Sequence, residues 1–491
     1  MKKTLVLLFL IGSFCQLKAT VGQIRWGSSG DPLNGLTVTW SNTGAADSVK
    51  WGYTTAFEKG KFIGIKRAGY TTASFFRYVF PTVTPSTVIY YSIYDSGAHT
   101  WGTQQTFTTS PPLNSTTFTF CALGDCRDVP ATLTAISNLV SARKPALTLF
   151  NGDLTLSGNN ASQLTTFFTS ASNFLANNIV YHAEGNHDAA SPSTFSNLFD
   201  LPITSGTNLY YAVKYGNAMF ITLNSCDPTN ATQLSWLKTT LASANADPSI
   251  TWKIVSCHHP FFNTGTHTGD MDSYRTTIWK AFDDYGVDLI LNGHDHNYQR
   301  SKPINLNTGS VGTPVAQYGS VTGQGRCEII SGGAGAGLYA QNTSSADAWA
   351  INLFNQNYNY VKCDVQGCKM VITAYNMSDV VIETFNLDKT GTATCNLATD
   401  VASTAVKFNP ISIFPNPVES TFTLHYSSEL TGEALIKIYD MNGKEVASEK
   451  TNKTSAEMEC KFDLSHHAKG VYTVSVIMGT QKDNAVLILR K

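Results

Sequence analysis

Five short polar motifs stand in order between residues 113 and 387, and each directly follows a run of hydrophobic residues. Such runs predict buried strands, and the segments between them include amphipathic, helix-like stretches such as residues 131–141. Strands that alternate with helices in this way predict an α/β domain. Because ligands bind where such strands end, we expect side chains distant in sequence to meet on one edge of the sheet. The five motifs are Gly124-Asp125, Gly152-Asp153, Gly185-Asn186-His187-Asp188, His258-His259-Pro260 and Gly293-His294-Asp295-His296.

The side chains in these motifs predict a metal site. Carboxylate, amide and imidazole groups together make an oxygen and nitrogen ligand set that suits divalent or trivalent transition metals. The number of groups fits two ions better than one. His294 and His296 stand at alternate positions just past a strand, so they point the same way if the extended chain continues, or reach neighbouring ions if the loop bends. A lone His-x-His pair is also common as a hydrogen-bonded pair, so the prediction depends on all five motifs.

The rest of the chain predicts further domains. Residues 20–111 contain short alternating runs, such as LTVTW and VIYYSIY, between turn residues, which is the pattern of a small β-sandwich without clustered His, Asp or Cys. Residues 112–388 form the α/β domain, residues 389–406 are a Thr- and Ala-rich linker, and residues 407–491 again alternate strand and turn. The predicted fold is therefore multidomain, with a β-sandwich at each end of an α/β domain.

The N-terminus predicts export. Residues 1–19 combine Lys2 and Lys3 with a short apolar run and small-residue cleavage near Ala19, which is the layout of a secretory signal. The run is too short to span a bilayer, and no other segment reads as transmembrane. The formal net charge is -1 and 14% of residues are charged, which argues against a nucleic-acid or membrane-surface role resting on bulk charge.

The cysteines predict a disulfide. Ten occur, and removal of the signal with Cys15 leaves an odd number in a chain that meets an oxidising compartment. Cys363 and Cys368 flank a turn between two strand-like runs, so we expect a Cys363–Cys368 bridge to close that hairpin. Cys121 with Cys126 is the weaker candidate pair.

The series GD, GD, GNHD, HHP and GHDH resembles the calcineurin-like metallophosphoesterases, and the sandwich ahead of it resembles the fibronectin-III-like leader of the purple acid phosphatases. The resemblance covers residues 21–387. It implies two sheets sandwiched by helices and two metal ions, which are iron, zinc or manganese. One ion would be held by Asp125, Asp153 and His296, and the other by Asn186, His258 and His294 together with Asp153, which would bridge the two.

The chain departs from that family at two positions. Where purple acid phosphatases have an iron-binding tyrosine, three residues after the bridging aspartate, this chain has Leu156. We therefore expect no purple colour. Where many other metallophosphoesterases have a histidine, two residues after the first aspartate, this chain has Arg127, so waters or Asp128 would complete the shell of the first ion.

The resemblance also implies a reaction, hydrolysis of phosphate monoesters by in-line attack of metal-bound hydroxide, as in acid phosphatases. His187 would contact the phosphate or protonate the leaving group, and His259 and Arg127 would be further contacts to the substrate. Two simpler roles stay open: His259 packs beneath the Pro260 turn, and Arg127 pairs with Asp125 or Asp128. A phosphodiesterase or nucleotidase on the same metal core is the alternative enzyme, and a surface adhesin with structural metals is the alternative of another class.

Other polar residues near the motifs have structural interpretations. Asp188 and Asp295 are expected to orient their histidine neighbours rather than bind metal, and His182, inside a strand run, is expected to be structural. The glycine-rich residues 331–337 lack the Lys-Ser/Thr of a phosphate loop, so they predict a turn or a flexible wall of the site.

Residues 407–491 carry a second resemblance. ISIFPNPV, KIYDMNGKEV and AKGVYTVSV occur in the order found in the C-terminal sorting domains of type IX secretion substrates. This implies recognition by that secretion machinery, and release from, or attachment to, the outer-membrane surface of a Gram-negative bacterium. Physically the segment predicts a small sandwich with a hairpin turn at Asn442-Gly443. An ordinary carbohydrate-binding or adhesive sandwich is the alternative.

Overall fold

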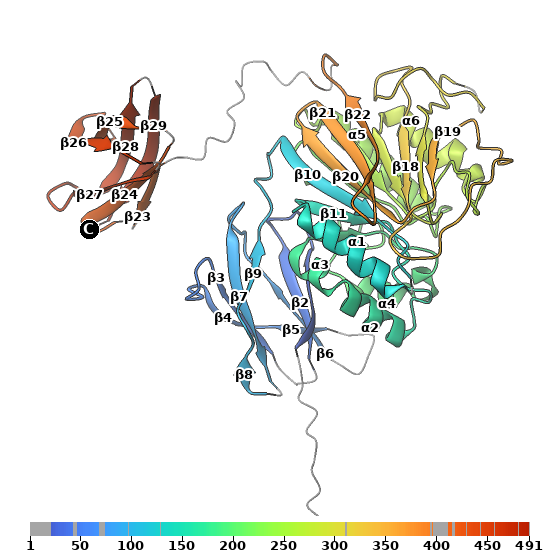
Figure 1. Cartoon of the computed structure of the whole chain (residues 1–491), viewed down its shortest axis with the longest axis horizontal. Helices are drawn as coiled ribbons and strands as arrows, with labels where there is room; N and C mark the ends of the chain where they lie inside the picture. The colour runs from blue at the N-terminus through green and yellow to red at the C-terminus, as the bar shows by residue number, and fades with distance from the viewer. Residues whose placement is uncertain are drawn as a thin grey trace, which may run out of the picture. The chain divides into compact units, whose positions relative to one another are not determined.

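The computed structural model divides the chain into two compact units, Met1–Asn396 and Leu397–Lys491, and the division falls within residues 389–406 (Figure 1). No described helix is both long and apolar enough to cross a membrane. The predicted signal, residues 1–19, and most of the predicted linker lie outside the described residues. The described residues are 21–42, 47–67, 74–96, 98–127, 129–309, 312–392, 395, 411–414, 418–428, 430–441, 443–455, 457–479 and 481–490.

The first unit begins with a sandwich of two antiparallel sheets around buried Trp26, Trp40 and Trp51. The all-β prediction for residues 20–111 therefore holds in the described residues, while likeness to fibronectin III stays a prediction. One sheet has the order β1 (Gly22–Ser28), β2 (Leu36–Asn42), β6 (Ser74–Val79), β5 (Ile65–Arg67). The other has the order β4 (Gly60–Ile63), β3 (Ser48–Gly52), β7 (Val88–Asp95), β8 (Thr100–Trp101), and β9 (Gln105–Thr108) also pairs with β7.

The α/β prediction for the following residues is confirmed. One sheet has the order β12, β11, β10, β20, β21, β22, and the other has the order β13, β14, β15, β16, β18, β17, β19. Strands β10 to β12 run parallel, as do β14, β15, β16 and β18. The bounds are β10 (Thr117–Leu123), β11 (Leu147–Phe150), β12 (Val180–His182), β20 (Asn359–Gln366), β21 (Lys369–Asn376), β22 (Val381–Asp388), β13 (Tyr211–Tyr215), β14 (Ala218–Thr222), β15 (Trp252–Ser256), β16 (Leu289–Asn292), β18 (Cys327–Ser331), β17 (Tyr298–Ser301) and β19 (Ile351–Asn355).

The two sheets face each other and helices cover their outer faces (Figure 1). Phe120 on β10 and Phe220 on β14 meet between the sheets with ring centroids 5.1 Å apart. α1 (Pro130–Ala142), α2 (Ala161–Ser170) and α3 (Ser172–Asn177) pack on the first sheet, and α5 (Ala231–Ala246) and α6 (Lys280–Tyr285) pack on the second. The short elements that complete this domain are η1 (Asp188–Ala190), α4 (Pro192–Leu198), η2 (Asp272–Tyr274) and η3 (Arg275–Trp279).

The N-terminal sandwich and the α/β domain share one continuous hydrophobic core. Trp26 on β1 forms a parallel bridge to Ile179, next to β12. The buried carboxylate of Asp200, in the segment after α4, accepts hydrogen bonds from the Arg67 and Arg77 guanidinium groups at 2.7 Å. The sandwich is thus firmly packed against the α/β domain.

The second unit is a small all-β sandwich, in agreement with its predicted alternation. Its described core includes Tyr426, Ile436 and Val474. Asn442 lies outside the described residues, and Gly443 has φ 77°, as a tight turn between antiparallel β25 and β26 requires. The sheets have the orders β23 (Ile411–Phe414), β24 (Thr421–Ser427), β27 (Glu457–Asp463), and β26 (Glu445–Lys453), β25 (Gly432–Tyr439), β28 (Gly470–Met478), β29 (Gln481–Leu489).

The predicted disulfide is wrong. Cys368 bonds to Cys395, and Cys363 is a free, buried cysteine. The reason is register: Cys363 on β20 lies opposite Ile372, whereas Cys368 stands in the turn between β20 and β21. The weaker candidate pair also fails, because Cys121 and Cys126 are both free.

Candidate metal centre

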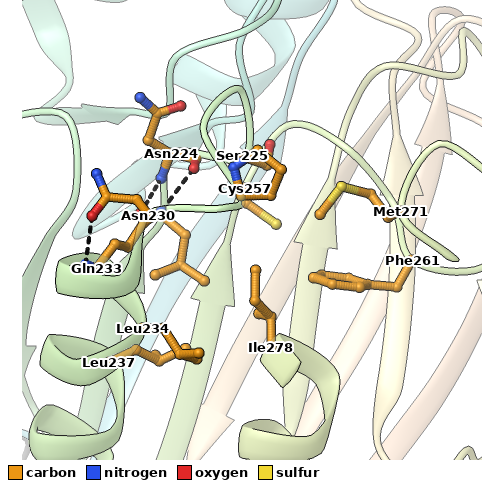
Figure 2. Close-up of a pocket in the computed structure, with 12 residues that line it drawn as sticks. Asn224, Ser225, Asn230, Gln233, Leu234, Leu237, Cys257, Phe261, Met271 and Ile278 are labelled. Atoms are coloured by element: carbon orange, nitrogen blue, oxygen red, sulfur yellow. Dashed lines mark hydrogen bonds between the residues drawn. The ribbon is translucent and has the colours of Figure 1, made fainter. Parts of the chain in front are cut away.

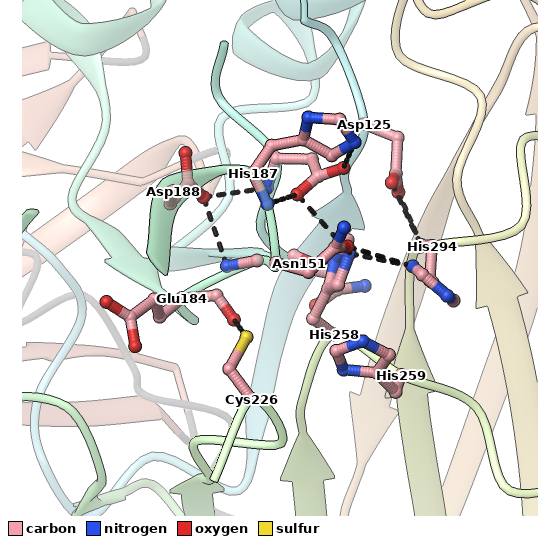
Figure 3. A network of polar contacts seen from close by, with 12 residues as sticks. Asp125, Asn151, Glu184, His187, Asp188, Cys226, His258, His259 and His294 are labelled. Carbon is pink, nitrogen blue, oxygen red and sulfur yellow. Dashed lines mark hydrogen bonds and ion pairs between the residues drawn. The ribbon is translucent and has the colours of Figure 1, made fainter. Parts of the chain in front are cut away.

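The five motifs meet where the parallel strands end, as the sequence predicts. Figure 3 shows His187 near Asp125, and His258, His259 and His294 gathered below them. The backbone is strained here, because Asp125, Asp153 and His294 adopt φ values of 62°, 55° and 72°. A left-handed conformation costs a non-glycine residue about 1–3 kcal/mol. The surrounding contacts hold this strain in place.

Two glycines allow the close approach of side chains. A Cβ atom on Gly152 would stand 2.7 Å from His258 Nδ1, and one on Gly293 would stand 2.2 Å from Asp125 Oδ2. Any larger residue at either position would push a polar side chain out of the site. The Gly in the GD and GHDH motifs therefore has a packing function.

The first ligand group consists of Asp125, Asp153 and His296, all buried, with one donor atom from each lying within 4.8 Å of the others. His296 Nδ1 donates to the Gly337 carbonyl at 2.8 Å, so its Nε2 carries a lone pair. This Nε2 is buried without a hydrogen-bond partner among the described residues and lies 3.8 Å from Asp125 Oδ1. An orphaned imidazole nitrogen facing buried carboxylates fits a cation between them.

The second candidate group is Asn186, His258 and His294, and His259 also brings a ring nitrogen within 4.8 Å of those of His258 and His294. His258 Nδ1 donates to the Asn151 carbonyl at 2.7 Å, which leaves a lone pair on Nε2. His294 Nε2 lies 3.1 Å from a carboxylate oxygen of Asp270, so the lone pair of His294 is on Nδ1. The two lone-pair nitrogens are 3.1 Å apart, and Asn186 Oδ1 lies 2.9 Å from one and 3.1 Å from the other. Three acceptors this close repel one another unless a cation lies between them.

Asp153 belongs to both groups. Its Oδ1 lies 3.4 Å from His258 Nε2, on the side of the second group. Its Oδ2 accepts from Arg127, and one of its oxygens lies within 4.8 Å of the ligand atoms of Asp125 and His296. Its position therefore suits a carboxylate that offers one oxygen to each of two ions.

The pKa shifts of the candidate ligands are also consistent with bound cations. Burial, with the nearby Asp153 charge, raises the pKa of Asp125 well above its usual value. Burial opposes ionisation of Asp153 too, but His258, His187 and Arg127 outweigh it and lower the pKa of Asp153. Burial lowers the pKa of His296 to about 4 and, with neighbouring histidines, lowers the pKa of His294 further. The imidazoles of His294 and His296 therefore stay neutral, as metal ligands must, and Arg127 only partly offsets the effect of burial on Asp125.

Asp188 and Asp295, which were expected to have supporting roles, accept hydrogen bonds from backbone amides of the site loops. Asp188 accepts from the amides of Asp153, Leu154 and Gly185 at 2.8–3.1 Å. Asp295 accepts from the amides of Thr266 and His267 at 2.9 and 3.2 Å. These carboxylates fix the loops on which the ligands stand.

The three residues with predicted catalytic roles border the ligand groups. His187 is half-buried, donates from Nδ1 to the Leu156 carbonyl at 2.7 Å, and places Nε2 3.9 Å from Asp153 Oδ2. His259 contacts Ser225 Oγ through Nδ1 at 2.9 Å, and its ring centroid lies 4.3 Å from that of His294. Burial lowers the pKa of His259 to about 3, so it is neutral.

Arg127 pairs with Asp153, a partner that the sequence did not predict. Its Nε and Nη2 donate to Asp153 Oδ2 at 3.2 and 3.1 Å, rather than to Asp125. Asp128, the other expected partner, lies outside the described residues. Leu156, which replaces the family tyrosine, is 43% exposed and adds no ligand.

Sequence reasoning missed four residues at the site. Asn151 accepts from His258 and bonds to the Asn292 carbonyl, and Asp270 bonds to His294. The His267 ring lies 4.2 Å from that of His294, and the Tyr339 ring stacks on His296 at 4.1 Å. Two features of the sequence could have indicated three of these residues: Asn151 directly precedes the second GD motif, and His267 and Asp270 are spaced three residues apart after the HHP motif. No sequence motif indicates Tyr339.

Two neighbouring segments complete the surroundings. The glycine-rich residues 331–337 lie against the first motif, since the Ala334 and Ala336 amides donate to the carbonyls of Gly124 and Asp125 at 2.9 Å. They form a wall of the site. A mostly apolar pocket lies behind the loops that carry Ser225 and Cys257, with Leu237 of α5 and Ile278 on its walls (Figure 2). It supports these loops without reaching the ligand atoms.

Comparison with known proteins agrees with this geometry. Residues 118–298 match the model of the calcineurin-like phosphoesterases. This part of the chain carries a calcineurin-like phosphoesterase domain. Residues 412–490 match the secretion system C-terminal sorting domain. The chain therefore carries a type IX sorting domain, which indicates secretion or a cell-surface location.

The curated relatives of this chain include plant enzymes. Purple acid phosphatase 1 of Ipomoea batatas is 25% identical over 302 residues, covering 55% of this chain and 62% of that protein. Purple acid phosphatase 15 of Arabidopsis thaliana is 32% identical over 134 residues, covering 25% of each chain. Phosphoenolpyruvate phosphatase of Allium cepa is 25% identical, covering 40% of this chain and 45% of that protein. The chain thus spans between a quarter and just under two thirds of these relatives.

Solved structures share the fold. Purple acid phosphatase PPD1 from yellow lupin (Lupinus luteus) seeds has a TM-score of 0.61 at 16% identity, covering 75% of this chain and 74% of that one. The structure of PhoD has a TM-score of 0.54 at 14% identity, covering 75% and 93%. The first unit therefore has a metallophosphoesterase-like α/β fold.

Proposed function

We propose that the chain is an exported binuclear metal phosphatase that hydrolyses phosphate monoesters. The observation that carries the proposal is the pair of acceptor clusters that share Asp153. In this proposal Asp125, Asp153 and His296 hold one ion, and Asn186, His258 and His294, with Asp153, hold the other. The sorting domain, and a cleaved signal in residues 1–19, would deliver the enzyme to the outer surface of a Gram-negative cell or to the medium.

The chain's own residues prepare the ligands. The Asn151 and Gly337 carbonyls fix His258 and His296 in the tautomers that leave Nε2 free. When bound, two metal ions supply activation of a water nucleophile and neutralise the charge of the phosphate oxygens. Arg127 adds a positive charge beside Asp153. This arrangement supports in-line displacement at phosphorus.

His187 is the proposed proton donor to the leaving alcohol. It is half-buried at the open side of the site, and its Nε2 faces the ligand groups while Nδ1 is anchored to the Leu156 carbonyl. A positioned imidazole contributes about 10²- to 10⁴-fold to such a transfer. His259 stays neutral and would contact a substrate oxygen or line the second group.

The metal identity remains part of the proposal. Neither ligand group contains a tyrosine among the described residues, and the position that would supply one is Leu156. We expect a protein that contains iron, zinc or manganese and lacks the purple charge-transfer colour of a tyrosinate-bound iron. Elemental analysis together with an absorption spectrum checks both expectations.

A pair of substrates tests the reaction. We expect kcat/KM to be at least about tenfold larger for 4-nitrophenyl phosphate than for bis(4-nitrophenyl) phosphate, because a monoester brings one more negative charge to the cations and Arg127. A larger constant for the diester would favour a phosphodiesterase on the same core. No hydrolysis of either by metal-loaded protein would favour an adhesin with structural metals.

Asp270→Asn tests the second ligand group. The substitution weakens the acceptor of His294 Nε2–H, so we expect metal affinity or kcat to fall about tenfold or more, as for other outer partners of metal-bound histidines. Metal titration followed by kinetics measures both. Asp272→Asn is the matched control, since Asp272 pairs with Arg275 instead of a histidine, and equal losses in both variants would contradict the assignment.

A further inference from the structure

The loops that surround the proposed metal centre are nearly free of positive charge. Seven loops leave the ends of the parallel strands, and together they contain one arginine, Arg127, and no lysine. Arg127 is already bound to Asp153 by two hydrogen bonds. In the described part of these loops, the one Lys or Arg side chain is thus already in an ion pair at the centre of the site. The loops are residues 124–129, 151–160, 183–191, 223–230, 257–274, 293–297 and 332–350.

The same rim carries exposed carboxylates. Asp270 is 46% exposed and its carboxylate contacts His294, a ligand of the second group, at 3.1 Å. Asp227 is exposed two residues from Ser225, which contacts His259. Among the described residues neither carboxylate forms an ion pair with Lys or Arg. Asp227 accepts hydrogen bonds from Thr229 and Asn230. A third exposed carboxylate of the rim, Asp272, is paired with Arg275. The first two carboxylates are exposed, and Asp270, which lies 3.1 Å from His294 and 3.8 Å from His267 Nδ1, adds its negative charge to the edge of the site.

The rest of the rim has no Lys or Arg side chain. His267 and Tyr339 stand beside the two ligand groups, and Leu156 is 43% exposed next to His187. A leaving group that extends from the phosphate would meet imidazole, phenol, leucine and carboxylate side chains. Charge of one sign on such a rim favours ligands of the opposite sign and opposes those of the same sign.

We propose that the site selects phosphate esters whose leaving group has no negative charge, and binds best those with a cationic, aminoalkyl leaving group. This inference rests on the proposed phosphatase function. The phosphoryl group is attracted by the cations at the centre, whereas the leaving group lies at the rim, where Asp270 contacts His294. Polyphosphates, bisphosphates and carboxylated phosphates should be poor substrates, because unpaired negative charges are brought together.

A matched set of ligands tests this without relying on turnover. Metal-loaded protein is titrated in a calorimeter with 2-aminoethylphosphonate, propylphosphonate and 3-phosphonopropionate, which carry a cationic, a neutral and an anionic tail. We expect affinity to fall in that order, by about fivefold or more at each step in dilute buffer. The differences should shrink in 0.5 M salt, because salt screens exposed charges. Equal or tighter binding of 3-phosphonopropionate would overturn the inference.

Kinetics with phosphoethanolamine, ethyl phosphate and phosphoglycolate should give the same order in kcat/KM. Ala340→Lys adds a cation to the rim at an exposed position beside Tyr339, and we expect it to reduce the preference severalfold. Thr322→Lys is the control. It adds the same charge in the exposed loop before β18, at the end of that strand remote from the site. An unchanged preference in Ala340→Lys would also overturn the inference. If metal-loaded protein hydrolyses none of the esters and binds none of the phosphonates, the proposed function itself fails.

Discussion

Asp153→Asn is expected to lower phosphoester hydrolysis by about a thousandfold or more. Asp153 is the one carboxylate that reaches both ligand groups among the described residues, with Oδ1 near His258 and one of its oxygens within 4.8 Å of the ligand atoms of Asp125 and His296. Loss of a bridging charge removes several kcal/mol of transition-state stabilisation, and about 4 kcal/mol is a thousandfold in rate. Turnover of 4-nitrophenyl phosphate and elemental analysis of the variant measure the effect.

The same substitution should leave the fold intact. An asparagine side chain keeps the shape of the aspartate and removes a buried charge, while Asp188 still holds the backbone amide at this position. The melting temperature should therefore stay close to that of the original chain. Asp388→Asn, at the half-exposed end of β22, is the control for loss of an aspartate. Full hydrolysis by Asp153→Asn would remove the basis of the binuclear proposal and leave the adhesin with structural metals as the better account.

The ligand-bearing edge was predictable because each motif follows a hydrophobic run. A buried strand ends where polar residues begin, and parallel strands bring such ends together. The order of runs and motifs therefore suffices to assign Asp125, Asp153, Asn186, His258, His294 and His296 to one pocket. Their separation into two groups was implied by family resemblance, and the structure supports it through the orphaned Nε2 of His296 and the facing nitrogens of His258 and His294.

Other features depended on information that local sequence lacks. The Cys363–Cys368 prediction failed because strand register decides which side chains face each other, and the true partner, Cys395, lies beyond β22. Arg127 had two expected acidic partners, Asp125 and Asp128, and only the fold shows that it reaches Asp153 instead. Tyr339 reaches His296 because the β18 loop folds back over the site, which no motif in that loop predicts.

His182→Phe is expected to stabilise the protein in acid. His182 is buried on β12, and both its ring nitrogens lack a hydrogen-bond partner among the described residues. Its ring stacks on Phe199 at 3.6 Å and lies 5.3 Å from Phe150, so a phenyl ring fits the same place. Burial, and then the Arg25 charge, lower the pKa of His182 well below 6.5. The folded protein therefore holds this histidine neutral.

The direction of the pH effect follows from proton linkage. Below pH 6.5 the unfolded chain protonates this histidine and the folded chain does not, so acid favours unfolding. The loss is about 1.4 kcal/mol for each pH unit between 6.5 and the folded pKa. It begins near pH 6.5 and ends when the pH reaches the folded pKa. In His182→Phe this contribution is absent, so the variant should gain little at pH 8 and most near pH 4.5, as measured by thermal melting after treatment with a chelator.

The location of His182 predicts where acid opens the original chain first. Phe199, its stacking partner, precedes Asp200, which the sandwich residues Arg67 and Arg77 bind. A protonated His182 would place a second positive charge beside Arg25 in this apolar contact, with no acceptor among the described residues to receive it. Hydrogen exchange at pH 4.5 should therefore rise around residues 195–201 in the original chain and stay low in His182→Phe. His466→Gln removes an exposed histidine from the second unit and should show the same exchange as the original chain. Equal exchange in all three proteins would show that protonation of His182 does not open this contact in acid.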